Sequence, residues 1–305
     1  FFNPVTINDV IDIVKKLDSN NSPGYDGIHP KVLKRSIFVI AKPLCNMINL
    51  AIEKGVFPDS LKIAKVIPIF KSGDKSMLTN YRPISVLSVF SKIFERIICN
   101  QLMSFVDKNN ILYSKQYGFR KGHSTYHALL DFTEKISCAF EQNDFLVGVF
   151  LDLSKAFDCI DHTILINKLR FYGIRGVAID FIISYLENRK QFVNIGNFTS
   201  YSLDILLGVP QGSNLGPLLF LLYVNDLPNA SEILSFILFA DDTSLFIAGN
   251  DPRSVNLVLN TELEKVYSWF LANKLLVNYN KTNYMVFKTK NKCVDLNVID
   301  VYIAN

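Results

Sequence analysis

Hydrophobic and polar positions along this 305-residue chain repeat with two periods, one typical of helices and one typical of strands. Apolar residues recur at helical spacing in several segments, which we expect to form helices: 8–17, 31–54, 85–105, 125–141, 165–172, 178–187, 215–224 and 251–273. Short apolar or alternating runs predict strands at 62–71, 145–153, 191–195, 202–207, 276–278 and 284–288, and a hairpin over 233–247. Because helices and strands follow one another irregularly, we expect an α+β fold with an antiparallel sheet.

Prolines and a turn sequence predict an exposed hairpin in the first third of the chain. Pro68 lacks a backbone N–H, so its strand is expected at a sheet edge. Ser72-Gly73-Asp74 is typical of a turn, and Pro83 favours an extended conformation for the residue before it, Arg82. Lys71 and Arg82 are therefore expected near the two arms of one hairpin.

The charge of the chain is unevenly distributed. Residues 62–121 hold eleven basic and three acidic residues, a net charge of +8, which leaves −4 for the remainder of a chain whose total is +4. A basic region facing an acidic site suits an enzyme that handles polyphosphates, although a solvated charged face is the simpler explanation of a basic stretch alone.

Composition narrows the class of protein further. A hydrophobic content of 49% supports a buried core, and five scattered cysteines without a CxxC pair argue against a disulfide framework or a zinc ribbon. The longest uncharged stretch, 205–225, contains glycines and prolines, so we expect no membrane partner. The chain begins without methionine, and we expect a fragment of a longer polypeptide.

Three aspartates suggest the chemistry. Asp241 and Asp242 lie between two apolar runs, and Asp152 ends another apolar run, 145–151. A carboxylate at the end of a buried strand is costly unless a partner offsets its charge, and a divalent cation is a common partner. If the two strands pair, the carboxylates converge and suggest a two-metal site for phosphoryl transfer. The alternatives are an exposed acidic turn and a buried acid paired with Lys155.

Several motifs then match one family in order. The catalytic region carries Leu-Asp-Leu-Ser-Lys-Ala-Phe-Asp at 151–158, Gly-Val-Pro-Gln-Gly-Ser at 208–213 and Phe-Ala-Asp-Asp at 239–242. Further matches are the segments 22–28, 68–71, 80–85, 116–120, 122–125 and 280–282. Together these motifs resemble the reverse transcriptases of non-LTR (LINE-type) retrotransposons, and the ordered set is far more specific than any one motif.

The resemblance implies a right-hand polymerase fold with fingers, an antiparallel palm sheet and packed helices. It predicts an N-terminal extension and fingers over 1–145 and a palm over 146–290 with an inserted fingers segment near 165–205. Residues 291–305 would begin a truncated primer-grip and thumb region, so the thumb is expected to be largely missing.

The resemblance also implies an RNA-directed DNA polymerase that transfers nucleotides from dNTPs to the 3′ end of a DNA primer. Asp152 and Asp241 would ligate both metal ions, and Asp242 would be the third carboxylate. The expected ion is Mg²⁺, with Mn²⁺ as an alternative. One ion would lower the pKa of the primer hydroxyl, and the other would neutralise charge on the leaving pyrophosphate.

By the same resemblance, five residues would contact the incoming dNTP. Lys71 and Arg82 would bind its triphosphate, and Phe157 would exclude a ribose 2′-hydroxyl by steric clash. Gln211 would lie beside the nascent base pair, and Lys281 would donate a proton to pyrophosphate. The simpler interpretations are exposed basic residues, a core phenylalanine and an ordinary turn.

Template and primer contacts are expected from Arg120, Lys121, Gly122 and Ser124 at the start of a helix; the alternative is a polar loop. The expected partners are an RNA template, a DNA primer or target, and dNTPs. An endonuclease and other domains would lie elsewhere in the full polyprotein. The family implies an intracellular protein, nuclear during target-primed synthesis and otherwise part of a cytoplasmic ribonucleoprotein.

Two other functions compete with this interpretation. RNA-dependent RNA polymerases also carry an acidic hairpin, but they typically have a second aspartate near the first motif, and Phe157 occupies the gating position instead. A non-catalytic nucleic-acid-binding scaffold derived from such an enzyme is the second alternative. The retention of all three aspartates, Lys71 and Arg82 argues against it.

Overall fold

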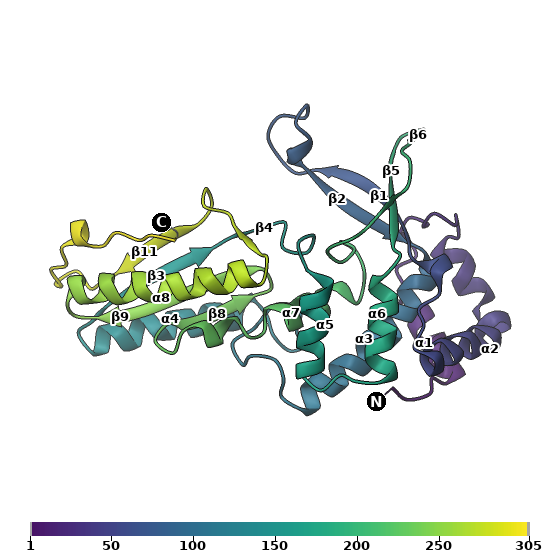
Figure 1. The fold of residues 1–305 in the computed structure, drawn as a ribbon, viewed down its shortest axis with the longest axis horizontal. Helices are drawn as coiled ribbons and strands as arrows, with labels where there is room; N and C mark the ends of the chain where they lie inside the picture. Colours follow the sequence, from purple (N-terminus) through teal and green to yellow (C-terminus); the bar gives the residue numbers. More distant parts are fainter. Residues whose placement is uncertain (1, 304–305) are drawn as a thin grey trace. The chain divides into compact units, whose positions relative to one another are not determined.

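The computed structural model describes residues 2–303, which divide into two compact units that we treat separately (Figure 1). Unit 1 comprises residues 2–111 and 160–219, and unit 2 comprises residues 112–159 and 220–303. Both mix helices and strands, so the predicted α+β class is confirmed. The predicted division into fingers, palm and thumb regions at 145 and 290 stays a prediction.

The helices of unit 1 are α1 (Ile7–Lys16), α2 (Pro30–Lys54), α3 (Val89–Lys108), α5 (His162–Phe171) and α6 (Val177–Leu186). Their ends follow from local chemistry. Thr6 and Asp9 form a capping box at the start of α1, and Gly55 ends α2 in the left-handed conformation. α2 has the length and apolar composition of a membrane-spanning helix, yet it carries a buried apolar face that includes Leu33 and Ile37. A buried face of this kind is typical of a core helix.

The sheet of unit 1 has the order β2-β1-β5-β6, with β7 also paired to β5. Its strands are β1 (Ile63–Phe70), β2 (Tyr81–Leu87), β5 (Lys190–Ile195), β6 (Phe198–Thr199) and β7 (Leu203–Asp204). β1 lies between two strands, so the prediction that Pro68 marks an edge strand is wrong. β1 pairs with β5 only as far as Val66. Pro68 lies beyond that pairing and opposite Pro83 of β2, where its missing N–H leaves no ladder bond unmade.

Two other boundaries in unit 1 differ from the prediction. Ser85 to Leu87 continue β2 instead of starting a helix, and α3 begins only after Ser88, whose hydroxyl caps the Phe90 N–H. The strand predicted at 202–207 is reduced to the two residues of β7. Apolar runs of this length fit a helix or a strand equally well, and tertiary pairing decided between them.

Unit 2 is built on a four-stranded antiparallel sheet of order β11-β3-β9-β8. Its strands are β3 (Phe145–Leu151), β8 (Ser235–Phe239), β9 (Asp242–Gly249) and β11 (Asn283–Phe287), and a separate pair joins β4 (Leu153–Ser154) to β10 (Leu276–Val277). The helices α4 (Thr125–Glu141) and α8 (Pro252–Ala272) lie on opposite faces of the sheet (Figure 1). The side chains on the α4 side include Leu146, Phe150 and Phe246.

The remaining helical segments are α7 (Gly216–Val224), which contains the boundary between the units, and the short 3₁₀ turns Asp59–Leu61, Leu78–Asn80, Leu227–Ala230 and Leu296–Val298.

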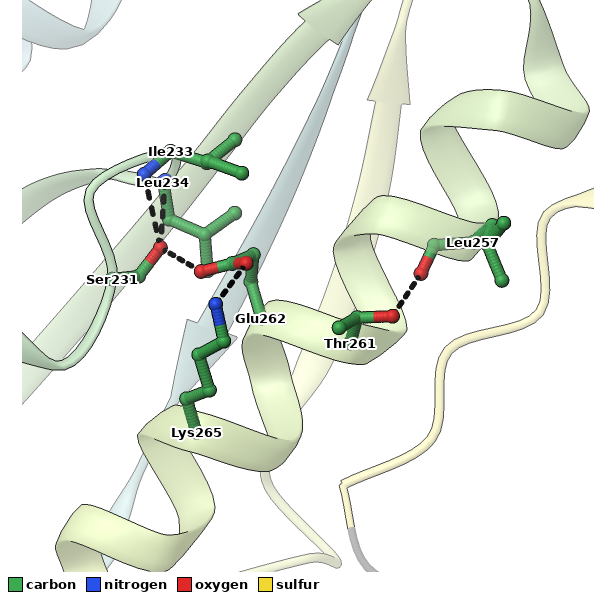
Figure 2. Close-up of polar contacts among 7 residues, drawn as sticks. All are labelled: Ser231, Ile233, Leu234, Leu257, Thr261, Glu262 and Lys265. Carbon is green, nitrogen blue, oxygen red and sulfur yellow. Dashed lines mark hydrogen bonds and ion pairs between the residues drawn. The ribbon is translucent and has the colours of Figure 1, made fainter.

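A buried carboxylate fixes the beginning of β8. Glu262 of α8 accepts a 2.6 Å hydrogen bond from the Ser231 hydroxyl and pairs with Lys265 at 2.6 Å (Figure 2). Ser231 in turn accepts from the backbone N–H groups of Ile233 and Leu234. This network connects α8 to the residues that lead into β8, the strand that ends at the acidic turn.

Candidate active site

Asp152 lies at the break between β3 and β4, one residue after the buried strand ends. Asn278 fixes it twice: the backbone N–H of Asn278 donates to the Asp152 carbonyl at 2.8 Å, and Nδ2 donates to Oδ2 at 2.9 Å. Lys281 Nζ lies 3.4 Å from the same Oδ2. Asp152 therefore ends its strand with one carboxylate oxygen held by an amide and approached by an ammonium group.

Asp241 and Asp242 lie in the β8–β9 hairpin. The two turn residues are Ala240 and Asp241, because Phe239 pairs with Asp242 across the turn. Asp241 therefore lies in the turn itself, and Asp242 is the first residue of β9. Ala240 takes the positive φ of +56° that such a turn favours and that glycine or asparagine adopts more readily.

Strand pairing brings the acids together. β3 and β9 are antiparallel neighbours, and their ladder runs to the pair Leu151–Thr243, so the next residues on the two strands are Asp152 and Asp242. Burial raises the pKa of Asp242, and the negative charges of Asp241 and Asp152 raise it further. The Asp242 carboxylate therefore lies near enough to Asp241 and Asp152 to be affected by both charges.

The donor chemistry suits a hard divalent cation. All three side chains are carboxylates, the ligands that Mg²⁺ selects, and a bound cation would offset the repulsion that Asp242 experiences from Asp152 and Asp241. Within residues 2–303 no three acidic, histidine or cysteine side chains are already grouped closely enough to form a coordination sphere. An apolar pocket of about 190 Å³ adjoins Asp242 beneath the sheet, lined by α4, β3, β8 and β9.

Phe157 lies in the turn after β4, five residues beyond Asp152. Its ring is half-buried, stacks on Phe220 with centroids 4.6 Å apart, and meets Phe119 edge-on at 6.1 Å. These contacts hold the ring in one place. They fit a rigid steric element and also a core residue, so the gating role stays a prediction.

Four residues predicted to bind template or primer lie before or at the start of α4. Lys121 and Gly122 are exposed, and Ser124 is the N-cap of α4, although its hydroxyl contacts His127 instead of a backbone N–H. The Arg120 guanidinium donates to the carbonyl groups of Tyr113 and Gln116. Arg120 therefore has a structural function within its own segment.

Lys71, Arg82 and Gln211 belong to unit 1. Lys71 directly follows β1 and Arg82 lies in β2, so the predicted placement on the two arms of one hairpin is confirmed, and both side chains are exposed. The Gln211 carbonyl accepts from the Ser85 N–H of β2 at 2.8 Å. The next residue, Gly212, has φ +120°, and a Cβ there would lie 2.7 Å from the Ser85 carbonyl oxygen, which explains glycine at this position.

The loop that carries Gln211 is also fixed from α3. Glu95, which is fully buried, accepts a 2.6 Å hydrogen bond from the Asn214 N–H and further bonds from Ser91 and Tyr185. Burial raises the pKa of Glu95, while the positive charge of the buried Arg189 opposes that shift. Unit 1 thus holds the Gln211 loop between a strand and a helix.

Comparison with known proteins decides the family. The model of the family described as "Reverse transcriptase (RNA-dependent DNA polymerase)" matches residues 69–296. The chain belongs to this family. It is 32% identical over 301 residues to the "Probable RNA-directed DNA polymerase from transposon BS" of Drosophila melanogaster, which covers 94% of this chain. It is 28% identical over 298 residues to the "RNA-directed DNA polymerase from mobile element jockey" of the same species, with 94% of this chain covered.

These relatives confirm the resemblance to reverse transcriptase domains of non-LTR retrotransposons. A third relative, the "Retrovirus-related Pol polyprotein from type-2 retrotransposable element R2DM" of Drosophila melanogaster, is 26% identical over 304 residues, 95% of this chain and 27% of its own length. The chain spans about a third of the length of the transposon BS and jockey proteins.

Two residues that contact this candidate site are not predicted from the sequence. Asn278 falls at the end of the predicted strand 276–278, and Gln116 begins the segment 116–120, for which the resemblance implies no function at this position. Gln116 is 2% exposed, and its side chain bonds to the turn at Ala240. Nothing in the sequence marks Gln116 as buried, and only its place in a family motif could have indicated a function; once buried, its amide has to find partners. For Asn278 the signal was weaker, since its partner is 126 positions away.

Proposed function

We propose that this chain is the RNA-directed DNA polymerase core of a non-LTR retrotransposon protein. It would transfer nucleotides from dNTPs to a DNA primer 3′ end on an RNA template. The observation that carries the proposal is the pairing of β3 with β9, whose ladder leads directly to Asp152 and Asp242. Family membership supports the reaction class.

In this proposal Asp152, Asp241 and Asp242 hold two Mg²⁺ ions, with Mn²⁺ as an alternative. The bound ions would supply charge neutralisation and a lower pKa for the primer hydroxyl. Asn278 keeps Asp152 oriented through its two hydrogen bonds. Lys281 lies beside the same carboxylate, where an ammonium group can screen the acidic cluster or pass a proton to leaving pyrophosphate.

The four-stranded sheet of unit 2 would be the palm, and the β1–β2 hairpin of unit 1 would belong to the fingers. Lys71 and Arg82 on that hairpin would bind the triphosphate, because two exposed cations on a strand pair can neutralise several phosphate oxygens. Gln211 would contact the nascent base pair from its fixed loop. Phe157, held by Phe220, would exclude the ribose 2′-hydroxyl.

The remaining parts of the proposal concern partners and place. Lys121, Gly122 and Ser124 would contact template or primer phosphates at the N-terminus of α4, with Arg120 shaping the segment that presents them. The thumb, an endonuclease and other domains would be supplied by the rest of the polyprotein. Synthesis at a nicked chromosomal target would place the protein in the nucleus, and a cytoplasmic ribonucleoprotein would precede that step.

The deciding experiment is primer extension on poly(rA)/oligo(dT) with Mg²⁺ and dTTP. The chain within its natural polypeptide is compared with its Asp241→Asn variant. Extension by the parent and not by the variant supports both the polymerase and its acidic site. Template binding without extension by either protein would favour a non-catalytic scaffold, and a preference for UTP over dTTP would favour an RNA polymerase.

A further inference from the structure

A short segment before α4 lies against the outer strand of the unit 2 sheet. Gln116 forms a parallel bridge with Leu238 of β8, the Tyr117 N–H donates to the Leu238 carbonyl at 2.8 Å, and the Leu238 N–H donates to the Lys115 carbonyl at 2.9 Å. Because β8 ends the strand order of this sheet, the segment supplies partners for its free edge. It runs toward the turn that carries Asp241.

The Gln116 side chain reaches that turn directly. Its Oε1 accepts hydrogen bonds from two backbone N–H groups, Gly118 at 2.8 Å and Ala240 at 3.0 Å. Gln116 is 2% exposed and Ala240 is 6% exposed, so water has little access to either group. Without the glutamine the Ala240 N–H would have to find another partner in a buried place, which is costly.

A close backbone contact acts on the same turn. A Cβ on Gly118 would lie 2.2 Å from the Ala240 nitrogen and 2.9 Å from its Cα, so the two backbones touch. Ala240 also holds a positive φ of +56°, a conformation that a residue with a side chain keeps only when its surroundings enforce it. The bond from Ala240 to Gln116 and the contact with Gly118 are both suited to enforce it.

The segment is itself anchored. Lys115 and Tyr117 both contact the carboxylate of Asp131 on α4 at 3.2 Å, and Arg120 donates to the Gln116 carbonyl at 3.2 Å. The segment that contains Gln116 is therefore held by side-chain hydrogen bonds on both sides of that residue. Its Nε2 has no hydrogen-bond partner among the described residues, so the carbonyl side of the amide carries its interactions.

We infer that Gln116 is a positioning residue for the acidic hairpin: it fixes Ala240 and so sets where Asp241 and Asp242 stand relative to Asp152. The inference rests on the proposed polymerase function for its kinetic consequence. Gln116 would act on the acids and not on the triphosphate, so its loss should lower kcat and leave the KM for dNTP nearly unchanged.

The test compares Gln116→Met with Gln116→Glu. Methionine fills a similar volume without an acceptor, whereas glutamate keeps acceptor oxygens for both N–H groups. Gln142→Met is the matched control, because Gln142 follows the opposite end of α4 and is exposed. Two experiments are made: primer extension gives kcat and KM, and NMR gives the hydrogen-exchange rate of the Ala240 amide.

We expect Gln116→Met to lower kcat about tenfold or more, in the range seen when groups that orient a site's ligands are removed. It should also speed exchange at Ala240 while the amide of Val147, within β3, stays protected. Gln116→Glu should keep the Ala240 amide protected. If Gln116→Met does not fold, Gln116→Asn, one methylene shorter, is measured instead and should give the same direction of change.

Unchanged kcat together with unchanged Ala240 exchange in a folded Gln116→Met or Gln116→Asn protein would overturn the inference. A loss of kcat with no change at Ala240 would overturn it as well, since the proposed route runs through that amide. A parent protein that fails to extend primers would refute the proposed function. If the exchange rate of its Ala240 amide still rises in Gln116→Met, the structural part of the inference, that Gln116 fixes the turn at Ala240, would stand.

Discussion

Asn278 holds Asp152 by its backbone and its side chain at once, with hydrogen bonds of 2.8 Å to the carbonyl and 2.9 Å to Oδ2. The first bond fixes where the chain leaves β3, and the second fixes the rotation of the carboxylate. Two bonds between the same two residues are a strict constraint, because neither can change without straining the other. The acid proposed to bind metal is thus oriented by a neighbour that needs no contact with substrate.

The first prediction separates these two functions. Asp152→Asn should lower the rate of the chemical step by several orders of magnitude with little loss of stability, because a proposed metal ligand is lost. Asn278→Ala should lower it less, by about 10–100-fold, as expected for a residue that orients a ligand. Single-turnover primer extension measures both, and thermal unfolding checks the fold. Near-normal turnover of Asp152→Asn would contradict the metal assignment.

Much of this site could be predicted from the sequence because each of the two strands is an apolar run with an aspartate at one end. Asp152 directly follows the apolar run 145–151, and Asp242 precedes another, so two apolar runs and one pairing of strands are sufficient to bring the acids together. The position of β1 could not be predicted in the same way. Pro68 indicates an edge strand, but β1 has a parallel partner, β5, more than a hundred residues away in the sequence. The pairing of β1 with β5 ends at Val66, before it reaches the proline.

Hydrogen bonds from the backbone of one segment to a side chain of a distant segment could not be predicted either. A hydrogen bond from Ala240 to Gln116 joins positions 124 residues apart, and nothing local in either segment specifies it. The same holds for Glu95 and Asn214, 119 residues apart. Periodicity locates elements, whereas such contacts depend on how distant elements meet.

The second prediction concerns sugar selection. Phe157→Val should raise the use of rNTPs relative to dNTPs by about tenfold or more, which corresponds to about 1.4 kcal/mol in the transition state, because the ring would no longer clash with a 2′-hydroxyl. Competing incorporation of UTP and dTTP measures the ratio. Phe287→Val is the control: it removes a half-buried ring opposite Leu146, near the other end of β3 from Asp152. Equal discrimination in both variants and the parent would assign Phe157 to the core alone.

The third prediction concerns the buried charges behind the Gln211 loop. Glu95 and Arg189 are both fully buried, and the Arg189 guanidinium lies over the Tyr185 ring at 4.7 Å with Nε and Nη2 unbonded among the described residues. Arg189 favours the ionised form of Glu95, and both side chains are removed from water, so Glu95→Gln and Arg189→Met should each destabilise the protein by about 1–3 kcal/mol.

The double variant should be more stable than the sum of the two losses predicts, because it leaves no isolated charge. Urea unfolding followed by circular dichroism gives the three values, and Lys190→Met, which removes the exposed neighbour of Arg189, is the control. Strict additivity of the two single losses would show that the charges do not depend on each other.

The last prediction is a pH dependence in unit 2. The hydrogen bond from Lys265 lowers the pKa of Glu262, and the bond from Ser231 lowers it further. A carboxyl group whose pKa is lower in the folded state contributes stability above its unfolded value of about 4.3, and this contribution is lost as pH falls through the folded pKa. Glu262→Gln should therefore be less stable than the parent at neutral pH, and the difference should shrink as pH falls below about 4.

The single tryptophan, Trp269, lies on α8 with Glu262, so its fluorescence reports unfolding of this helix directly. Urea midpoints at a series of pH values give the difference between the two proteins. Glu264→Gln is the matched control, because Glu264 is exposed on the same helix and its loss should leave the midpoint unchanged. A Glu262→Gln penalty that is constant from neutral to acidic pH would show that the charge of Glu262 does not stabilise the junction of α8 with β8. Its hydrogen bond to Ser231 would then be sufficient to hold the strand that ends at the acidic turn.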